Sequence, residues 1–201
     1  MAELRFIYGS MNSGKSLYLA AKAFNLSERH VRHIIIKPTT DTRDSAAFIS
    51  SRALVDKTPC IPIAPDDSLI DLFYDHHSDS KYILVDEAQF LTSLQVEQLV
   101  AICDLSDVDV FCYGLRTDFK TNLFPGSKRL FELADVVEQM TTICPCGKHA
   151  LINARFDEYG YIIDEGSQID CGAEEKYISL CRSCYRELMV KKKSVFELLG
   201  K

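Results

Sequence analysis

The apolar residues of this chain fall into short continuous runs that alternate with amphipathic stretches. The runs are rich in isoleucine, valine and leucine without polar alternation, which is typical of strands buried on both faces of a parallel sheet. The stretches between them repeat apolar residues at helical spacing, and Thr92 with Gln95 predicts a capping box. Strands are predicted at residues 4–8, 31–36, 82–85, 108–113 and 136–141, and helices at 15–26, 66–77, 92–103 and 128–133.

Strands that alternate with helices predict a doubly wound α/β domain, with a mostly parallel sheet and helices on both of its faces. The pattern changes near residue 142, where short strand-like segments replace the long alternation. These later segments lie at 150–156, 159–163 and 177–180, and a helix is predicted at 182–192. We therefore expect a first domain at 1–142, a small second domain at 143–193 and a C-terminal tail at 194–201.

Composition limits the classes of protein to which the chain can belong. Of its 201 residues 47% are hydrophobic and 26% are charged, so the chain can bury a core. Lys and Arg number 23 against 29 Asp and Glu, a net charge of −6, which argues against a protein that mainly binds nucleic-acid backbones. No apolar run is long enough to span a membrane, and the N-terminus does not resemble a signal peptide. We therefore expect a cytoplasmic protein with neither nucleic acid nor membrane as a partner.

A glycine-containing loop follows the first predicted strand and opens the first helix. Its residues, Gly9, Ser10, Met11, Asn12, Ser13, Gly14, Lys15 and Ser16, match the pattern G-x-x-x-x-G-K-[ST] in full. In such a loop backbone N–H groups surround phosphate oxygens, the lysine reaches the β- and γ-phosphates, and the serine hydroxyl binds Mg²⁺. The loop therefore predicts a site for a nucleoside triphosphate with Mg²⁺.

An acidic pair, Asp86 and Glu87, follows the predicted strand at 82–85. Because the carboxyl ends of parallel strands meet at one edge of a sheet, Asp86 should lie beside the phosphate loop and bind Mg²⁺. Glu87 should point in another direction and act as a general base. It would polarise a water molecule in an ATPase, or accept the proton of a substrate hydroxyl in a small-molecule kinase.

Four of the eight cysteines form two close pairs, Cys144-x-Cys146 and Cys181-x-x-Cys184. Four thiolates at such spacing are typical of a closed, tetrahedral structural zinc site. His149 could replace one thiolate or could be an exposed histidine near a turn, and a C-x-x-C can also be a redox pair. We expect zinc to order the segment between the two pairs, which has few residues for a core of its own.

Together these motifs resemble those of the type II thymidine kinases. The matching segments follow in order along nearly the whole chain: GSMNSGKS at 9–16, DTR at 41–43, VDEAQF at 85–90, GLRTDF at 114–119, the two cysteine pairs, and EEKY at 174–177. The first cysteine pair is one residue shorter than in many relatives. The resemblance implies a P-loop NTPase-type (RecA-like) core with a small C-terminal zinc-ribbon or lasso domain. It also implies a homotetramer that transfers the γ-phosphate of ATP to the 5′-hydroxyl of thymidine, with Mg²⁺ and a structural Zn²⁺.

The resemblance also implies roles for individual residues. Glu87 would accept the proton of the 5′-hydroxyl, and Ala88 and Gln89 lie in the turn where the family contacts the nucleotide. Arg43 would steady the charge on the transferring phosphate. Phe119 would stack on thymine. The lasso segment that closes over the base corresponds to Gln168, Ile169, Asp170, Cys171, Gly172 and Tyr177.

Simpler alternatives stay open for several of these residues and for the function. Phe119 could be a core residue, Tyr177 a strand residue beneath the lasso, and Arg43 a solvated loop charge. The rival functions are a P-loop ATPase that acts on nucleic acid through a zinc ribbon, and a kinase for another deoxynucleoside. The first rival needs a basic surface near the cysteines. Residues 157–175 instead contain seven acidic residues and no lysine or arginine.

Overall fold

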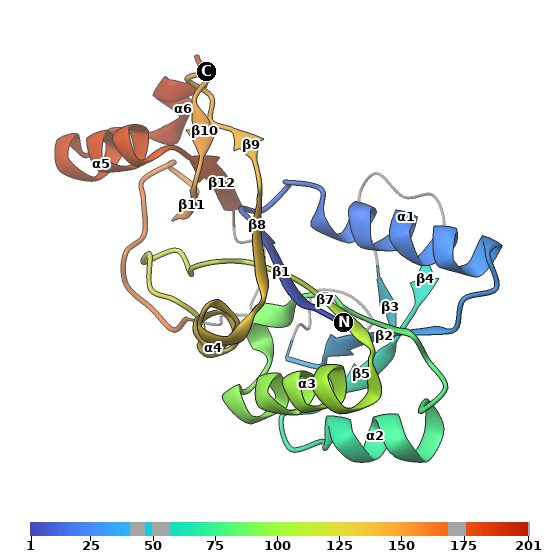
Figure 1. The fold of residues 1–201 in the computed structure, drawn as a ribbon. Helices are drawn as coiled ribbons and strands as arrows, with labels where there is room; N and C mark the ends of the chain where they lie inside the picture. The colour runs from blue at the N-terminus through green and yellow to red at the C-terminus, as the bar shows by residue number, and fades with distance from the viewer. Residues whose placement is uncertain (41–46, 50–56, 169–175, 201) are drawn as a thin grey trace.

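The computed structural model describes residues 1–40, 47–49, 57–168 and 176–200 (Figure 1). A six-stranded sheet of order β5-β2-β6-β7-β1-β8 lies at its centre, and every neighbouring pair of strands in it is parallel. The predicted mostly parallel sheet is therefore confirmed. Its strands are β1 (Leu4–Gly9), β2 (His33–Pro38), β5 (Ile61–Ile63), β6 (Tyr82–Val85), β7 (Asp109–Gly114) and β8 (Val136–Met140).

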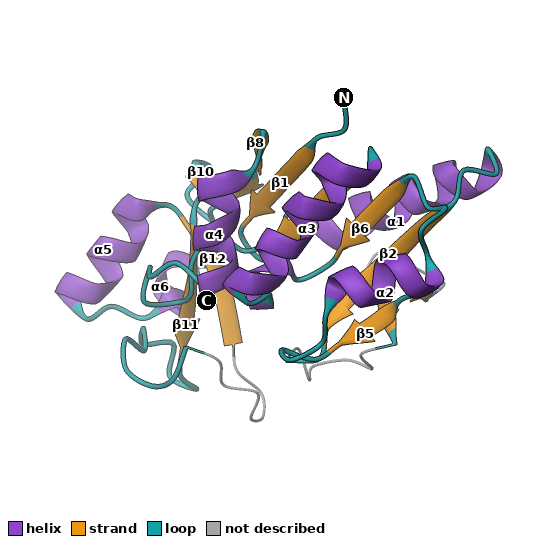
Figure 2. Ribbon diagram, turned by 60° about the horizontal axis from the view of Figure 1, so that its bottom comes forward, coloured by secondary structure: helices purple, strands orange, loops and turns teal. Residues whose placement is uncertain are grey.

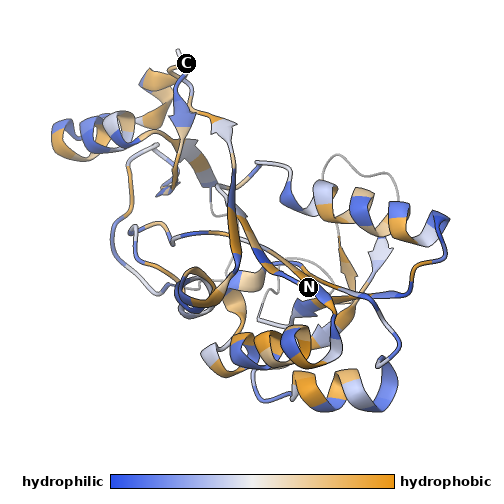
Figure 3. Cartoon of the chain, in the orientation of Figure 1, coloured by the Kyte–Doolittle hydropathy of each residue, from blue (hydrophilic) through white to orange (hydrophobic). Residues whose placement is uncertain are grey.

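Helices lie on both faces of this sheet, as predicted (Figures 1 and 2). On one face α1 (Lys15–Glu28) packs through the fully buried Leu19. The opposite face is covered by α2 (Leu69–His76), α3 (Ser93–Ser106) and α4 (Pro125–Leu133), whose apolar side chains form one cluster with the strands. Figure 3 shows hydrophobic and hydrophilic residues intermixed along these helices, as amphipathic helices that cover a sheet require.

Two helix starts differ from the sequence prediction by three residues. Helix α2 begins at Leu69 rather than at 66, because the side chain of Ser68 caps it by accepting a hydrogen bond from the N–H of Asp71 (3.2 Å). Helix α4 begins at Pro125 rather than at 128. Proline favours the first position of a helix because its fixed φ suits the helix and its missing N–H is not needed there.

Four short elements in the first half of the chain were not predicted separately. Strands β3 (Phe48–Ile49) and β4 (Thr58–Pro59) form an antiparallel pair, and β5 extends the central sheet beside β2. A single 3₁₀ turn, η1 (Ala88–Phe90), follows β6. Within the described ranges, no helix is long and apolar enough to cross a membrane.

Beyond β8 the chain forms a small unit, which we call the C-terminal module. Two antiparallel ribbons, β9–β10 and β11–β12, precede its helices. Its apolar cluster joins Cys144, Leu180, Leu188 and Val195, so residues 195–198, which the sequence placed in a tail, pack within it. Its elements are β9 (Thr142–Ile143), β10 (His149–Ala150), β11 (Ile152–Phe156), β12 (Lys176–Leu180), α5 (Arg182–Lys191) and α6 (Val195–Leu198).

The strand predicted at 159–163 is wrong. The chain turns there because the Asp157 carboxylate accepts hydrogen bonds from the N–H groups of Tyr159 (3.0 Å) and Tyr161 (2.8 Å). Only an isolated bridge between Phe156 and Ile162 forms in this stretch. The local side-chain bonds to the backbone therefore compete successfully with a strand ladder.

Candidate active site and metal centre

The phosphate loop joins the end of β1 to the start of α1. Gly14 adopts a left-handed backbone with φ of 86°, a conformation that glycine enters without steric cost, and Asn12 also has a positive φ of 61°. The Lys15 ammonium lies 2.9 Å from the carbonyl oxygen of Ser10 and 3.3 Å from that of Gly9, and only 8% of the residue is exposed. The loop therefore holds a buried positive charge of the kind that stabilises a bound phosphate.

Ser16 and Asp86 meet at the carboxyl edge of the sheet. The Ser16 hydroxyl donates to Asp86 Oδ1 at 3.2 Å, and Asp86 is only 3% exposed at the end of β6. Burial, followed by the neighbouring charge of Glu87, raises the pKa of Asp86 to about 7. A hydroxyl and a carboxylate are hard oxygen ligands of the kind that Mg²⁺ prefers. A divalent cation bound here would also remove the electrostatic cost of keeping this carboxylate ionised.

Lys37 is a site residue that the sequence reasoning missed. It lies in β2, is 2% exposed, and its positive charge opposes the rise in the pKa of Asp86. The N–H of Asp86 also donates to the carbonyl of Ile36 at 3.0 Å, so β2 and the acidic pair are joined directly. The sequence contained one sign of this role. Lys37 directly follows the run of three isoleucines in a strand expected to be buried, and a buried lysine almost always has a charged neighbour.

Glu87 adopts a left-handed backbone conformation with φ of 51° and ψ of 39°. Non-glycine residues seldom adopt it, and such residues cluster at functional sites. The carboxylate of Glu87 accepts a hydrogen bond from Gln89 Nε2 at 2.5 Å. Gln89 is fully buried, and its Oε1 accepts the N–H of Leu115 at 2.9 Å. Gln89 thus bridges Glu87 to the backbone that follows β7.

Gly114, the last residue of β7, leaves room for this bridge. A Cβ atom added at Gly114 would lie 2.9 Å from Gln89 Oε1 and 3.0 Å from the backbone nitrogen of Gln89. A side chain at this position would therefore push Gln89 away from Leu115. The glycine of the GLRTDF segment is explained by this close approach.

The residues expected to bind a nucleoside come together between the loop after β7 and the β11–β12 ribbon. Phe119 is buried, and the guanidinium carbon of Arg155 lies 5.1 Å from its ring centroid. Tyr177 is the register partner of Arg155 across the ribbon. Gln168 Nε2 donates to Asp118 Oδ2 at 3.0 Å. The other residues of this set lie outside the described ranges: Arg43, Ile169, Asp170, Cys171 and Gly172.

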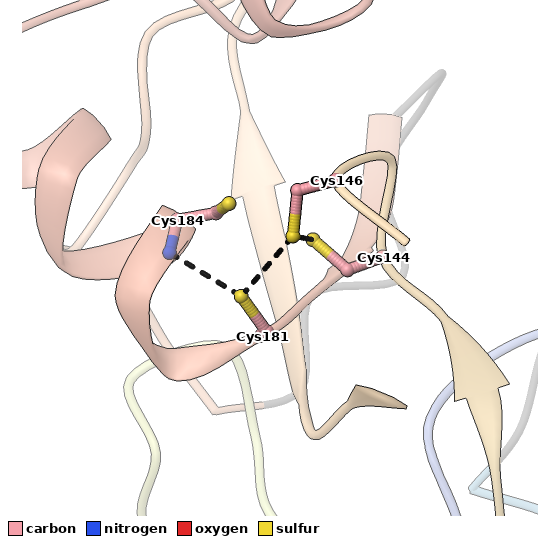
Figure 4. A group of neighbouring side chains, drawn as sticks. All are labelled: Cys144, Cys146, Cys181 and Cys184. Atoms are coloured by element: carbon pink, nitrogen blue, oxygen red, sulfur yellow. Dashed lines mark hydrogen bonds between the residues drawn. The ribbon is translucent and has the colours of Figure 1, made fainter. Parts of the chain in front are cut away.

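The four paired cysteines form one cluster (Figure 4). The Sγ atom of Cys146 lies 3.5 Å from that of Cys144 and 3.7 Å from that of Cys181, and all four Sγ atoms lie within 4.8 Å of one another. A zinc ion with Zn–S bonds of about 2.3 Å needs sulfur–sulfur separations of about 3.8 Å. The cluster therefore fits tetrahedral zinc. His149 is exposed on β10 and lies outside it.

Backbone hydrogen bonds and burial act differently on the four sulfurs. A hydrogen bond from the backbone of Lys148 is the largest of several that lower the pKa of Cys146 to about 7, whereas burial raises the pKa of Cys144 and Cys184. The short Cys144–Cys146 spacing is accommodated by a tight turn, in which the N–H of Gly147 donates to the Cys144 carbonyl at 2.8 Å. On the other side Cys181 caps α5 by accepting the N–H of Cys184 (3.5 Å).

The chain has relatives across nearly its full length. A model of the family described as TK: Thymidine kinase matches residues 2–185. A thymidine kinase of Enterobacteria phage T4 is 43% identical over 194 residues, covering 95% of this chain and 99% of the relative. One from Vibrio cholerae is 40% identical over 190 residues (94% and 99%), and one from Rhodopirellula baltica is 39% identical over 189 residues (93% and 89%).

The solved structures that match this chain are more distant in sequence. The genome packaging NTPase B204 of Sulfolobus turreted icosahedral virus 2 is 19% identical, with a TM-score of 0.40, over 73% of this chain and 78% of that one. This likeness adds nothing to the assignment, which depends on the sequence relatives and on the family match. The motifs described above all begin within the matched residues 2–185, and the identity is spread over more than nine-tenths of the chain. The chain therefore belongs to the thymidine kinase family.

Proposed function

We propose that this protein is an ATP-dependent kinase that transfers the γ-phosphate of ATP to the 5′-hydroxyl of thymidine. The observation that carries the proposal is the match to thymidine kinases over 93–95% of this chain. The residues matched by the family model, 2–185, span the phosphate loop, the acidic pair and the cysteine pairs. The rival of a nucleic-acid ATPase is not favoured by these relatives.

In the proposed mechanism, ATP lies on the phosphate loop. Backbone N–H groups of residues 9–16 surround its phosphates, and Lys15 offsets the negative charge of the β- and γ-phosphates. The close pair of Ser16 and Asp86 fits Mg²⁺, which when bound would neutralise charge on the same phosphates. Lys37 adds a buried positive charge behind Asp86. These residues supply positioning and electrostatic stabilisation, the main requirements of phosphoryl transfer.

Glu87 is proposed as the general base that accepts the proton of the 5′-hydroxyl. Its carboxylate lies at the same sheet edge as Asp86, and the amide of Gln89 fixes one of its oxygens. Gln89 is therefore proposed as a positioning residue for Glu87, in addition to its expected place in the nucleotide-contacting turn with Ala88.

The acceptor is proposed to bind between Phe119 and the lasso. Phe119 is the proposed stacking ring by resemblance to the family, although Arg155 lies over it in this structure, while Gln168 joins the loop after β7 through Asp118. Tyr177 and residues 169–172 complete the proposed lasso. Main-chain groups there would match the polar edge of thymine, and closure would exclude water that otherwise hydrolyses ATP. A zinc ion on the four cysteines would hold the ends of this segment in place.

The substrate assignment is tested with a panel of the common nucleosides and γ-labelled ATP. We expect label on thymidine and its close analogues, with little on purine nucleosides or cytidine. Label on a different deoxynucleoside would establish the rival kinase. Rapid hydrolysis of ATP without label on any nucleoside would refute the kinase assignment itself.

The proposal extends to a homotetramer in the cytoplasm, by resemblance to the family. Helix α1 supports an assembly because three of its large apolar side chains face solvent, with exposed fractions of 39% for Leu17, 60% for Tyr18 and 67% for Phe24. Exposed apolar groups clustered on one helix are typical of contact surfaces between subunits. The mass of the protein in solution, measured by light scattering, tests this assembly.

Replacing Gln89 by leucine is expected to lower kcat about tenfold with little change in the KM for ATP. The change removes the bond to Glu87 and leaves the buried N–H of Leu115 without its acceptor. Gln98→Leu is the matched control, because Gln98 Oε1 likewise accepts a backbone N–H, that of Leu69 at 3.0 Å, far from the site. Steady-state kinetics compare the kcat of the two variants. An equal loss of kcat in both variants would show that Gln89 acts only through stability.

A further inference from the structure

The C-terminal module is hydrogen-bonded to the phosphate loop at Met11. The N–H of Met11 donates to Asn153 Oδ1 at 2.7 Å, and the carbonyl of Met11 accepts the hydroxyl of Ser179 at 2.9 Å. Figure 1 shows β11 and β12 beside the connection between β1 and α1. Both polar backbone atoms of Met11 are therefore held by side chains of the module.

Asn153 and Ser179 act as a pair because they are direct register partners in the β11–β12 ribbon. Residues that face each other across an antiparallel ribbon project their side chains from the same side of it. Asn153 is only 4% exposed, so water competes little for its amide. Hydrogen bonds in such surroundings are stronger, and leaving one of their groups unmatched is more costly.

The same face of the ribbon continues to the nucleoside residues. Arg155 and Tyr177, two positions along each strand, form the next pair on this face, and Arg155 lies over the ring of Phe119. The opposite face carries Ala154 and Leu180, which pack in the apolar cluster that also contains the cysteines. One side of the ribbon thus spans both substrate regions, while the other is anchored beside the metal centre.

The phosphate loop needs such support because of its backbone conformation. Asn12, which follows Met11 directly, has a φ of 61°. A non-glycine residue in the left-handed region is disfavoured, so the loop keeps this form only if its surroundings hold it. A site that already has the binding conformation spends less binding energy on ordering its own backbone.

We infer that Asn153 and Ser179 are positioning residues that hold the phosphate loop in its nucleotide-binding conformation, so that ATP affinity depends on the C-terminal module. The inference rests on the proposed placement of ATP on this loop. Neither side chain needs to touch ATP, because both act through the backbone of Met11. The zinc-bound module then serves the phosphate site as well as the nucleoside site.

The test measures the dissociation constant of MgATP by calorimetry, without any nucleoside. Asn153→Ala is expected to weaken binding about tenfold, because it removes the acceptor of a backbone N–H in a buried place. Ser179→Ala is expected to weaken binding about threefold, and Ser179→Thr, which keeps the hydroxyl, should stay within twofold of the parent. The KM for thymidine at saturating ATP should change less than twofold in all three.

Ser194→Ala is the matched control. The Ser194 hydroxyl donates to a backbone carbonyl in the same module at the same distance, 2.9 Å, but that carbonyl belongs to Tyr159 rather than to the phosphate loop. This variant should melt at a lower temperature and bind MgATP as the parent does. The melting temperature and zinc content of every variant are recorded to separate local from global effects.

Two results would overturn the inference. One is MgATP affinity within twofold of the parent in both Asn153→Ala and Ser179→Ala. The other is an equal loss of affinity in Ser194→Ala, which would mean that module stability alone governs the loop. If Asn153→Ala does not fold, the comparison of Ser179→Ala with Ser179→Thr still decides. Because no acceptor is present, a parent protein that binds ATP but fails to phosphorylate thymidine would refute the proposed function and not this inference.

Discussion

Glu87→Gln is expected to lower kcat by about 10³-fold, within the range that a general base contributes. Glutamine has the same shape but cannot accept a proton. Its amide oxygen can still accept the hydrogen bond from Gln89 Nε2, so the local geometry is preserved. MgATP binding, measured without nucleoside, should stay within about threefold of the parent because the phosphate contacts are untouched.

Glu97→Gln provides the control for this change. Glu97 lies on the exposed side of α3, where it pairs with Arg129 at 3.0 Å, and exposed pairs of this kind contribute little. Its turnover should equal that of the parent. Normal turnover in Glu87→Gln would show that Glu87 is not the general base. Asp86 and the other groups at this sheet edge would then be the candidates.

Cys181→Ser is expected to abolish zinc binding and reduce thymidine phosphorylation at least about 100-fold. Serine keeps the cap of α5, because its hydroxyl can accept the same N–H, but an alcohol does not replace a thiolate as a zinc ligand. Structural zinc contributes about 10–16 kcal/mol to the folding of small zinc domains, so the module should lose its ordered core. Zinc content by mass spectrometry and the thermal unfolding curve report the two effects.

Cys103→Ser separates metal loss from general destabilisation. Cys103 lies on the buried face of α3 and is 3% exposed, so a serine there buries a hydroxyl and should also lower the melting temperature. This variant should keep its zinc and most of its activity. Full zinc content and normal activity in Cys181→Ser would contradict a four-cysteine structural site.

Much of the core could be predicted because local pattern and local chemistry agree there. The isoleucine run of β2 and the YILV run of β6 give buried parallel strands, and Thr92 with Gln95 does form the capping box expected at α3. The cysteine pairs fall together as their spacing indicated. In each case the signal lies within a few residues of sequence.

The parts that were missed depend on distant or very short segments. β5 has three residues and contains a proline, so its strand pattern is too brief to recognise. The role of Gln89 depends on the backbone of Leu115, and the contacts of Met11 depend on Asn153 and Ser179. No periodicity along the chain encodes such pairs, because they arise only when the sheet and the ribbon are assembled.

The two hydrogen bonds that hold Met11 affect when the phosphate loop gains its support during protein synthesis. The loop motif is complete after sixteen residues, but its supports, Asn153 and Ser179, follow Met11 by 142 and 168 positions. At about 5–20 residues per second, a ribosome adds the second support roughly 10–30 s after the motif has been made. Until then a nascent chain carries the phosphate motif on a backbone without these two supports. Full affinity for ATP should therefore arise only when the β11–β12 ribbon has left the exit tunnel and folded against the loop.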